Sequence, residues 1–329
     1  MFSAFLFQEC LVFEGFLISY PSEIVGKQIK NMRLHIFSFA VGNTVMLITV
    51  FDPWKSQLCT CPDKLTFNPY TGCDHGCLYC YASSYIPRFY DCRPKKNLLS
   101  RLKREAARLN GELISISNSS DPYPRLEQKS GLTRKCLEIL AESCCRLQIV
   151  TKSDLVVRDI DILKKVPCVV SLTVLTDDDE LSRKLEPAAP ISSRRLKAIE
   201  TLVREGIPTT VRIDPVIPFL NDDLAGLVEA VASLGVLHIT SSSYKVKPDN
   251  WKRFSAVFPE VAEKLKPLYF SEGEKIGRST YLPKRLRFGL MKKLKELAEE
   301  HNLKFGCCRE GFSLNSAVCD GSWAIQKHE

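Results

Sequence analysis

Residues 72–81 read Gly-Cys-Asp-His-Gly-Cys-Leu-Tyr-Cys-Tyr, which places Cys73, Cys77 and Cys80 in a CxxxCxxC spacing. Such short intervals let the backbone turn each sulfur back toward the previous one, so the three thiolates can surround one compact soft-metal centre. Three cysteines cannot all pair with one another as disulfides. We therefore predict that this loop binds an iron–sulfur cluster and leaves one iron open for a further ligand.

A structural zinc site is the alternative for this loop. Zinc in structural sites takes four ligands, and His75, Cys59 or Cys61 is available as the fourth. However, no second CxxC follows at the spacing of a zinc finger. The ligand count and the position of the loop favour the cluster.

The composition is that of an ordinary globular protein with an unusual number of cysteines. The 329 residues carry 46 Lys and Arg against 38 Asp and Glu, a net charge of 46 − 38 = +8, and 45% are hydrophobic. This excludes a disordered tail, a collagen and a small disulfide-stapled scaffold. The 14 cysteines must be explained by their spacing.

The N-terminal stretch is rich in Phe but does not resemble a signal peptide or a membrane anchor. Glu9 and Glu14 interrupt it, no basic residues precede it, and no small-residue cleavage site follows. We expect a cytoplasmic protein that does not contact membranes, because a cluster also needs reduced thiols. We assign residues 1–45 to an N-terminal extension, with Met32 and Met46 as alternative starts.

The rest of the chain alternates short apolar runs with amphipathic helices, the order expected of a parallel α/β fold. Six such units are too few for a closed eight-stranded barrel, and no GxGxxG motif follows the first strand. We predict a partial (βα)6 TIM-like barrel over residues 46–245. A helical, cysteine-containing C-terminal extension follows over 246–329, with substrate binding as its expected role. The expected strands span residues 64–68, 112–117, 147–151, 168–174, 209–213 and 236–240, and the expected helices 95–110, 132–145, 156–165, 192–205 and 222–234.

The cysteine loop resembles the signature of the radical S-adenosylmethionine (SAM) superfamily. There, CxxxCxxC holds a [4Fe-4S] cluster whose open iron binds the amino and carboxylate groups of SAM. The aromatic residue before the last cysteine, here Tyr79, lies beside the adenine. Further stretches resemble the spore photoproduct lyase-like proteins, or DNA repair photolyases of the radical SAM type: SISNSSDPYPRLEQKSGLTR at 115–134, KLEPAAP at 184–190 and DPVIPFLN at 214–221.

The resemblance implies a lyase-like radical SAM enzyme of DNA repair. Its cofactors are the [4Fe-4S] cluster and SAM, which is cleaved reductively to methionine and a 5'-deoxyadenosyl radical that removes a substrate hydrogen. An electron donor such as ferredoxin or flavodoxin is the implied protein partner. Nucleic acid, DNA or RNA, is the implied substrate.

Polar residues that follow the predicted strands are the candidates for holding SAM. Ser117, Ser119 and Asp121 offer short acceptors for its amino group. A polar turn ahead of Pro122 also accounts for Asp121. Lys152 is either a point charge for the SAM carboxylate or an exposed loop lysine.

Two candidates lie within strands. Ser171 matches the ribose-contacting position of the superfamily, and the period of a strand places it opposite Val170 and Leu172. Arg212 is flanked by apolar residues and needs an anionic partner. That partner is either an anion at the barrel mouth or a buried carboxylate, with Asp214 or Glu186 available.

One departure from true spore photoproduct lyases concerns the hydrogen donor. In the pattern associated with them, a cysteine beyond the second strand returns a hydrogen atom to the product, whereas residues 118–121 contain no thiol. Repair of the spore lesion itself is therefore not expected. The sequence leaves open the roles of Cys59, Cys61, Cys307, Cys308 and Cys319. We interpret as packing residues Cys10, Cys92, Cys136, Cys144, Cys145 and Cys168.

Two basic runs indicate what the substrate is. Residues 88–108 contain eight basic and two acidic residues, and residues 275–295 contain eight basic residues, no acid, and the aromatics Tyr281 and Phe288. Clustered cations with interleaved aromatics are typical of nucleic-acid binding. The alternative is the solvated face of helices whose other side is apolar.

Two further functions stay open from the sequence. One is a radical SAM enzyme that modifies a protein or a small molecule, with the basic runs serving solubility. The other is a zinc-binding nucleic-acid adaptor without enzymatic activity.

Overall fold

The computed structural model describes residues 10–13, 16–19, 46–52, 58–116 and 119–325. Its centre is an eight-stranded sheet in the order β14-β11-β10-β9-β8-β7-β4-β3. β3 pairs antiparallel with β4, and all other neighbours are parallel. The strands are β3 (Thr49–Val50), β4 (Leu65–Phe67), β7 (Glu112–Ile116), β8 (Cys145–Thr151), β9 (Cys168–Thr173), β10 (Thr209–Val216), β11 (His238–Ser243) and β14 (Lys304–Cys307).

The predicted open barrel of six βα units is confirmed. β4 and β7 to β11 correspond to the six expected strands, and β14 and β3 form the two free edges of the sheet. Helices connect successive parallel strands, as that pairing requires. Between the strands lie α2 (Leu98–Ala106), α3 (Glu127–Ser130), α4 (Leu132–Ala141), α5 (Ile160–Leu163), α6 (Asp179–Leu185), α7 (Ser192–Arg204) and α8 (Ala225–Ser233).

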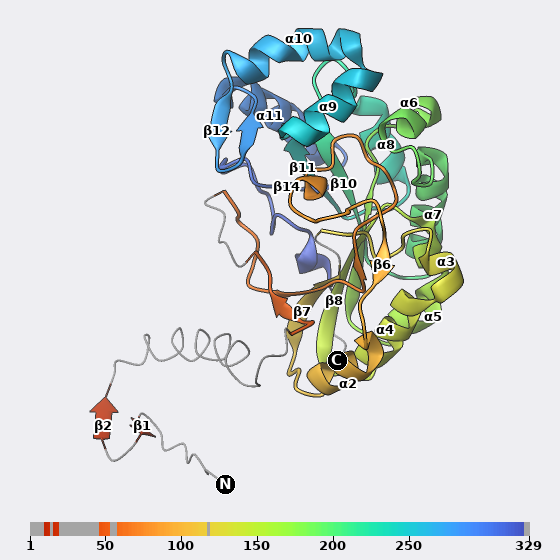
Figure 1. The fold of residues 1–329 in the computed structure, drawn as a ribbon, viewed down its shortest axis with the longest axis vertical. Helices are drawn as coiled ribbons and strands as arrows, with labels where there is room; N and C mark the ends of the chain where they lie inside the picture. Colours follow the sequence, from red (N-terminus) through yellow and green to blue (C-terminus); the bar gives the residue numbers. More distant parts are fainter. Residues whose placement is uncertain (1–9, 14–15, 20–45, 53–57, 117–118, 326–329) are drawn as a thin grey trace.

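The helix expected over 156–165 is shorter than predicted. A 3-10 turn, Asp154–Asp159, begins where Ser153 accepts the Leu155 amide, and α5 follows it. Figure 1 shows α4, α5, α7 and α8 in a row outside the strands.

The two faces of the sheet differ in polarity. On β9, Val170 and Leu172 join the main hydrophobic core with the surrounding helices, whereas Ser171 lies on the opposite face. The same alternation on β10 places Val211 in the core and Arg212 opposite. The face turned away from the helices, which is the inside of the barrel, is therefore polar.

The C-terminal extension adds a seventh parallel strand that the sequence analysis did not predict. β14 pairs with β11, and Phe305 of β14 is fully buried in the main core. Before it come α9 (Pro248–Val257), α10 (Pro259–Phe270), the hairpin of β12 (Glu274–Ile276) and β13 (Ser279–Tyr281), and α11 (Lys284–Glu300). The assignment of this extension to substrate binding stays a proposal.

A second core lies at the carboxyl ends of the strands. Leu175 follows β9, Ile217 follows β10, and Tyr244 follows β11; all three pack with residues of α9 and α10. Cys77 and Tyr79 of the cysteine loop belong to the same cluster. The loop therefore lies at the end of the barrel where parallel α/β folds bind ligands.

Three of the six predicted packing cysteines are buried, Cys92 is half-buried, and the side chain of Cys10 lies outside what the structure describes. Cys136, Cys145 and Cys168 lie in the main core, but Cys144 is exposed, so its assignment as a packing residue was wrong. Cys307, whose role the sequence left open, also packs in that core. Of the described helices, none has both the length and the apolar character needed to cross a bilayer.

Candidate active site

The cysteine loop runs from Gly72 to Tyr81, after β5 (Tyr70–Thr71), which pairs with β6 (Arg93–Pro94). Gly72 has a φ of +81°, and a Cβ at this position would lie 2.3 Å from the Phe89 carbonyl oxygen. That oxygen accepts the Cys73 amide at 2.8 Å. Only glycine permits this close approach, which fixes where Cys73 begins the loop.

The segment between α6 and α7 holds one side of the loop. The Leu78 amide donates to the Leu185 carbonyl at 2.9 Å, and the Ala188 amide donates to the His75 carbonyl at 3.0 Å. Leu185 and Ala188 belong to the KLEPAAP motif at residues 184–190. The motif therefore pins the cysteine loop by backbone hydrogen bonds.

Helix α9 holds the other side. Asn250 Nδ2 donates to the Tyr79 carbonyl at 3.0 Å, and Arg253 Nη2 donates to the Cys80 carbonyl at 2.9 Å. Sequence reasoning missed both residues because their partners lie about 170 positions away. The loop is thus fixed from two directions.

The three thiols are withdrawn from solvent, because Cys73 and Cys77 are buried and Cys80 is half-buried. Burial raises the pKa of each, to about 12 for Cys77, while the nearby Lys152 ammonium acts in the opposite direction on Cys77 and Cys80. Metal ligands bind as thiolates, so a metal centre would stabilise their charged form here.

The arrangement of the thiols bears on the kind of metal centre. In the described part of the chain, no group of three or more His, Cys, Asp or Glu side chains is already arranged to hold a metal ion. A four-iron cluster binds each of its cysteines to a different iron, so its ligands need not converge on one ion.

Glu186 is the centre of the charge network beside the loop. It is 1% exposed; its Oε2 lies 2.5 Å from Arg195 Nη1, and its Oε1 accepts the Tyr79 hydroxyl and lies 4.0 Å from Lys152 Nζ. Burial, together with the charges of Cys77 and Glu186, raises the pKa of Tyr79 well above its usual value. Tyr79 therefore stays protonated and acts as a donor.

Arg195 is fully buried and is the residue that sequence reasoning most clearly missed. Besides its ion pair, it donates to the Pro190 carbonyl at 2.7 Å and the Thr173 carbonyl at 2.9 Å, which ties the motif to the end of β9. A signal was present, because Arg195 lies on the apolar face of α7 with Ile199 and Leu202. A charge on that face requires a buried partner.

Asp121 joins the ends of β7 and β8. Its Oδ2 accepts the Lys152 amide at 2.8 Å, and its Oδ1 accepts the Thr151 hydroxyl at 2.7 Å and the Tyr123 amide at 2.9 Å. His75 Nδ1 lies 3.6 Å from Oδ2. Asp121 is therefore engaged within the chain and fixes the backbone of Lys152.

The Lys152 side chain points to the same network. Its Nζ lies 5.7 Å from the centre of the Tyr79 ring. Burial lowers the pKa of Lys152, but the nearby Cys77 and Glu186 charges outweigh burial and raise it, so the ammonium stays charged. Of the other candidates in the loop after β7, Ser119 is half-buried, and Ser117 lies outside the described residues.

Ser171 lies on the inner face of the barrel, and its environment fits a bound ligand. Its side chain is fully buried, and its hydroxyl has no hydrogen-bond partner among the described residues. A buried hydroxyl without a partner is costly. A hydroxyl or ether oxygen of SAM would satisfy it.

Arg212 does not join this network. Its Nη2 pairs with Asp214 Oδ2 at 2.8 Å, Asp214 also accepts the Ser242 hydroxyl at 2.5 Å, and Arg212 interacts electrostatically with Cys308. Burial lowers the pKa of Arg212, but Asp214 and Cys308 raise it more strongly. The structure thus shows the ion pair with Asp214, one of the two partners expected from the sequence.

Comparison with known proteins identifies the family. The model of the radical SAM superfamily matches residues 67–231, half of the chain. The chain belongs to the radical SAM superfamily. Members of this superfamily bind a [4Fe-4S] cluster and SAM. The buried thiols of the CxxxCxxC loop and the unsatisfied Ser171 hydroxyl fit these two cofactors.

Several proteins are similar to the chain over about half to three quarters of its length. An uncharacterized protein of Methanocaldococcus jannaschii is 35% identical over 167 residues, 48% of this chain and 62% of that protein. One of Mycobacterium tuberculosis is 28% identical over 270 residues, 74% of this chain and 76% of that protein. A spore photoproduct lyase variant, solved with AdoMet and dinucleoside spore photoproduct, has a similar fold, with a TM-score of 0.57, 14% identity and 77% of each chain covered.

Removing either partner of the buried Glu186–Arg195 pair should destabilise the fold. We expect Glu186→Gln and Arg195→Met each to lower the free energy of unfolding by about 3–5 kcal/mol, because each leaves the partner polar group or charge buried without its ion pair. The double variant should lose less than the sum of the two. Urea unfolding followed by circular dichroism measures this.

The exposed Lys197–Glu200 pair on the same helix, with a 2.7 Å separation, is the matched control. Lys197→Met should leave the midpoint of unfolding unchanged. Single variants at Glu186 and Arg195 that behave like this control would contradict the assigned role of the pair.

Proposed function

We propose that this chain is a radical SAM enzyme whose cluster is held by Cys73, Cys77 and Cys80. The observation that carries the proposal is the fixed loop that presents three shielded thiols at the ligand-binding end of the barrel. When bound, the cluster and SAM supply one-electron cleavage of the SAM carbon–sulfur bond, and the resulting 5'-deoxyadenosyl radical removes a substrate hydrogen. The protein supplies orientation and exclusion of water.

Each part of the site has a role in that orientation. Lys152, held by Asp121 through its backbone, provides the positive charge for the SAM carboxylate. Ser171 hydrogen bonds the ribose. Tyr79, anchored on Glu186, gives the adenine a ring to lie against. Ser117 and Ser119 remain the candidates for the SAM amino group.

Water exclusion comes from the second core. Tyr244, Phe254 and Leu265 are fully buried around the inner side of the cysteine loop. A dry surrounding protects a reactive radical from side reactions. Helices α9 and α10 thus wall the site at the carboxyl end of the barrel, and Figure 1 shows both helices at that end of the molecule.

Cys77→Ala tests the site directly. We expect the variant, purified and reconstituted without oxygen, to lose the visible absorbance of the cluster and the production of 5'-deoxyadenosine together. Cys144→Ala removes an exposed thiol outside the site and should retain both. Mass spectrometry of the product and absorbance of the protein are the readouts, and a Cys77→Ala variant that still cleaves SAM would refute the assignment.

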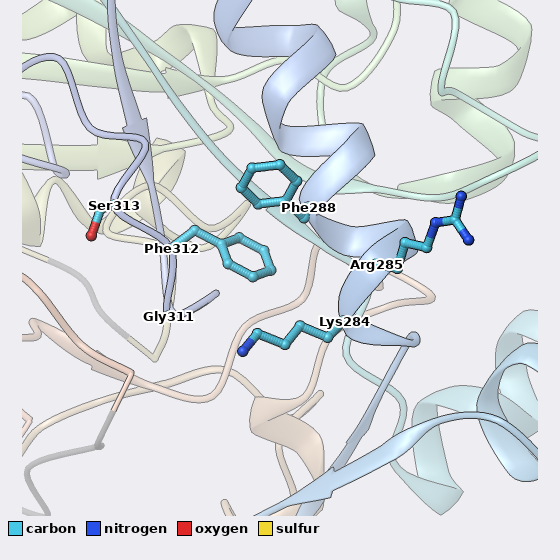
Figure 2. A pocket seen from close by; sticks show the side chains of 6 residues that line it. All are labelled: Lys284, Arg285, Phe288, Gly311, Phe312 and Ser313. Carbon is cyan, nitrogen blue, oxygen red and sulfur yellow. The ribbon is translucent and has the colours of Figure 1, made fainter.

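We further propose nucleic acid as the substrate. A pocket of about 570 Å³ lies between α11 and residues 311–313, and Figure 2 shows Phe288 and Phe312 side by side at its centre. Their rings are 5.3 Å apart and edge to face, and Phe288 is 43% exposed. Neither Lys284 nor Arg285, which also line it, has an ion-pair partner among the described residues.

Exposed aromatic rings beside unpaired cations suit a base and its phosphate. The net charge of +8 favours such a polyanion. The spore photoproduct lyase with a similar fold was solved with a dinucleoside lesion, which supports the same class of substrate. Within the part of the chain that the structure describes, no comparable feature favours a protein substrate.

Lys284→Ala with Arg285→Ala tests the nucleic-acid proposal. Each lost phosphate contact should reduce the slope of log affinity against log salt by about 0.7 for a single-stranded oligonucleotide. Phe288→Ala should weaken binding by about 1–3 kcal/mol through lost stacking. Fluorescence anisotropy over a series of salt concentrations measures both effects.

The control variant removes the same number of positive charges from the same helix but leaves the pocket intact. Lys292→Ala with Lys293→Ala removes two cations of α11 that do not line the pocket. Equal losses from both double variants would indicate nonspecific charge attraction. Wild-type affinity that is flat across salt would reject nucleic acid as the substrate.

A further inference from the structure

Four cysteines outside the CxxxCxxC loop meet at the open seam of the barrel. Cys59 and Cys61 lie between β3 and β4, at one edge of the sheet. Cys308 directly follows β14, the opposite edge, and Cys319 lies in the segment that leads away from it. The two edges share no strand pairing, so whatever joins these cysteines joins the two sides of the seam.

The thiols are in contact or in electrostatic range of one another. Cys319 Sγ lies 3.5 Å from Cys61 Sγ, and Cys59, two residues before Cys61, interacts electrostatically with the Cys61 thiol. Cys308 interacts electrostatically with both Cys61 and Cys319. All four are free thiols.

The backbones that carry two of these thiols are fixed. The Cys308 amide donates to the Ser241 carbonyl at 2.7 Å, and the Cys319 carbonyl accepts the Thr240 hydroxyl at 3.0 Å. A Cβ on Gly306 would lie 2.2 Å from the Cys319 carbonyl oxygen, so the two segments touch closely. The ligand frame is therefore largely set before any metal binds.

Cations surround the four thiols. Lys64 interacts electrostatically with Cys61, Arg309 with Cys59, and Arg212 with Cys308. None of these cations belongs to the site around Glu186.

We propose that Cys59, Cys61, Cys308 and Cys319 form a second metal centre, a zinc site separate from the cluster loop. Zn–S bonds of about 2.3 Å in a tetrahedron give S···S edges of about 3.8 Å. The 3.5 Å between Cys61 and Cys319 is close to such an edge. The cysteines of an iron–sulfur cluster bind separate irons and lie farther apart, so zinc fits better.

Closing the tetrahedron requires two side chains to move. No three of the described His, Cys, Asp and Glu side chains already surround one ion, here or in the CxxxCxxC loop of this cluster-binding superfamily. Cys59 and Cys308 therefore rotate toward the Cys61–Cys319 pair when zinc binds. Cys308 exchanges its electrostatic interaction with Arg212 for a metal bond, and the protons released by the thiols go to solvent.

Such a centre would cross-link the two open edges of the barrel. It would link β14 to the segment ahead of β4 across the seam, beside the existing Lys64–Asp320 ion pair of 2.5 Å. Because structural zinc contributes its binding free energy to folding, its loss should destabilise the C-terminal segment. This role does not depend on the radical chemistry proposed above.

Metal analysis of the full chain tests the proposal in a background without the cluster. A variant with Cys73, Cys77 and Cys80 changed to Ala should retain about one zinc per chain and no iron. Adding Cys61→Ser and Cys319→Ser should remove the zinc, and Cys59→Ser alone, at a half-exposed position, should release it while the fold is kept. Cys144→Ser is the matched control and should retain zinc.

The wild-type protein provides a second test. It should contain zinc in addition to the cluster iron, and its melting temperature should fall when a chelator removes the zinc. Absence of stoichiometric zinc from both proteins overturns the proposal. So do iron and sulfide in place of zinc in the cluster-free variant, or a Cys61–Cys319 disulfide mapped in metal-free protein. Loss of SAM cleavage in the cluster-free variant bears only on the proposed function.

Discussion

The buried pairing of Glu186 with Arg195 is the constraint on which the arrangement of the site depends. The Arg195 guanidinium binds backbone carbonyls at the end of β9 and in the segment before α7, while Glu186 accepts the Tyr79 hydroxyl. One ion pair thus connects the barrel to the loop that carries the cysteines. Two buried charges are costly to desolvate, so the pair is better explained by the position it enforces than by the stability it adds.

The polar inner face of the barrel follows from the period of its strands. Every second residue of β9 and β10 packs against the helices, and the residues between them face inward. This places Ser171 and Arg212 inside without any special local sequence. The charged side chains at this face have different partners. Lys152 and Glu186 lie beside the cysteine loop, whereas Arg212 pairs with Asp214 and interacts with Cys308.

Much of the fold could be predicted from the sequence, because local patterns determine it. Apolar runs and glycine stops located six strands, and the CxxxCxxC spacing located the loop. β14 was missed because its four residues follow a long charged helix and carry little apolar signal of their own. The exposure of Cys144 beside buried Cys145 shows how adjacent residues at the start of a strand face opposite ways.

The side-chain network could not be predicted in the same way. Tyr79 and Glu186 are 107 positions apart, and Cys61 and Cys319 are 258 positions apart. No periodicity within one element specifies such pairs. For Arg212 the sequence offered two carboxylates; Asp214 lies two residues along the same strand and on the same face, whereas Glu186 is paired with Arg195.

In the proposed site, Cys73, Cys77 and Cys80 hold the cluster and leave one iron open to SAM. The most direct measurement is electron–nuclear double resonance of the reduced, reconstituted protein with SAM that carries an isotopic label on its amino nitrogen. We expect a coupling between the cluster spin and that nitrogen in the wild-type protein. A fully assembled cluster that shows no such coupling in the presence of saturating SAM would contradict it.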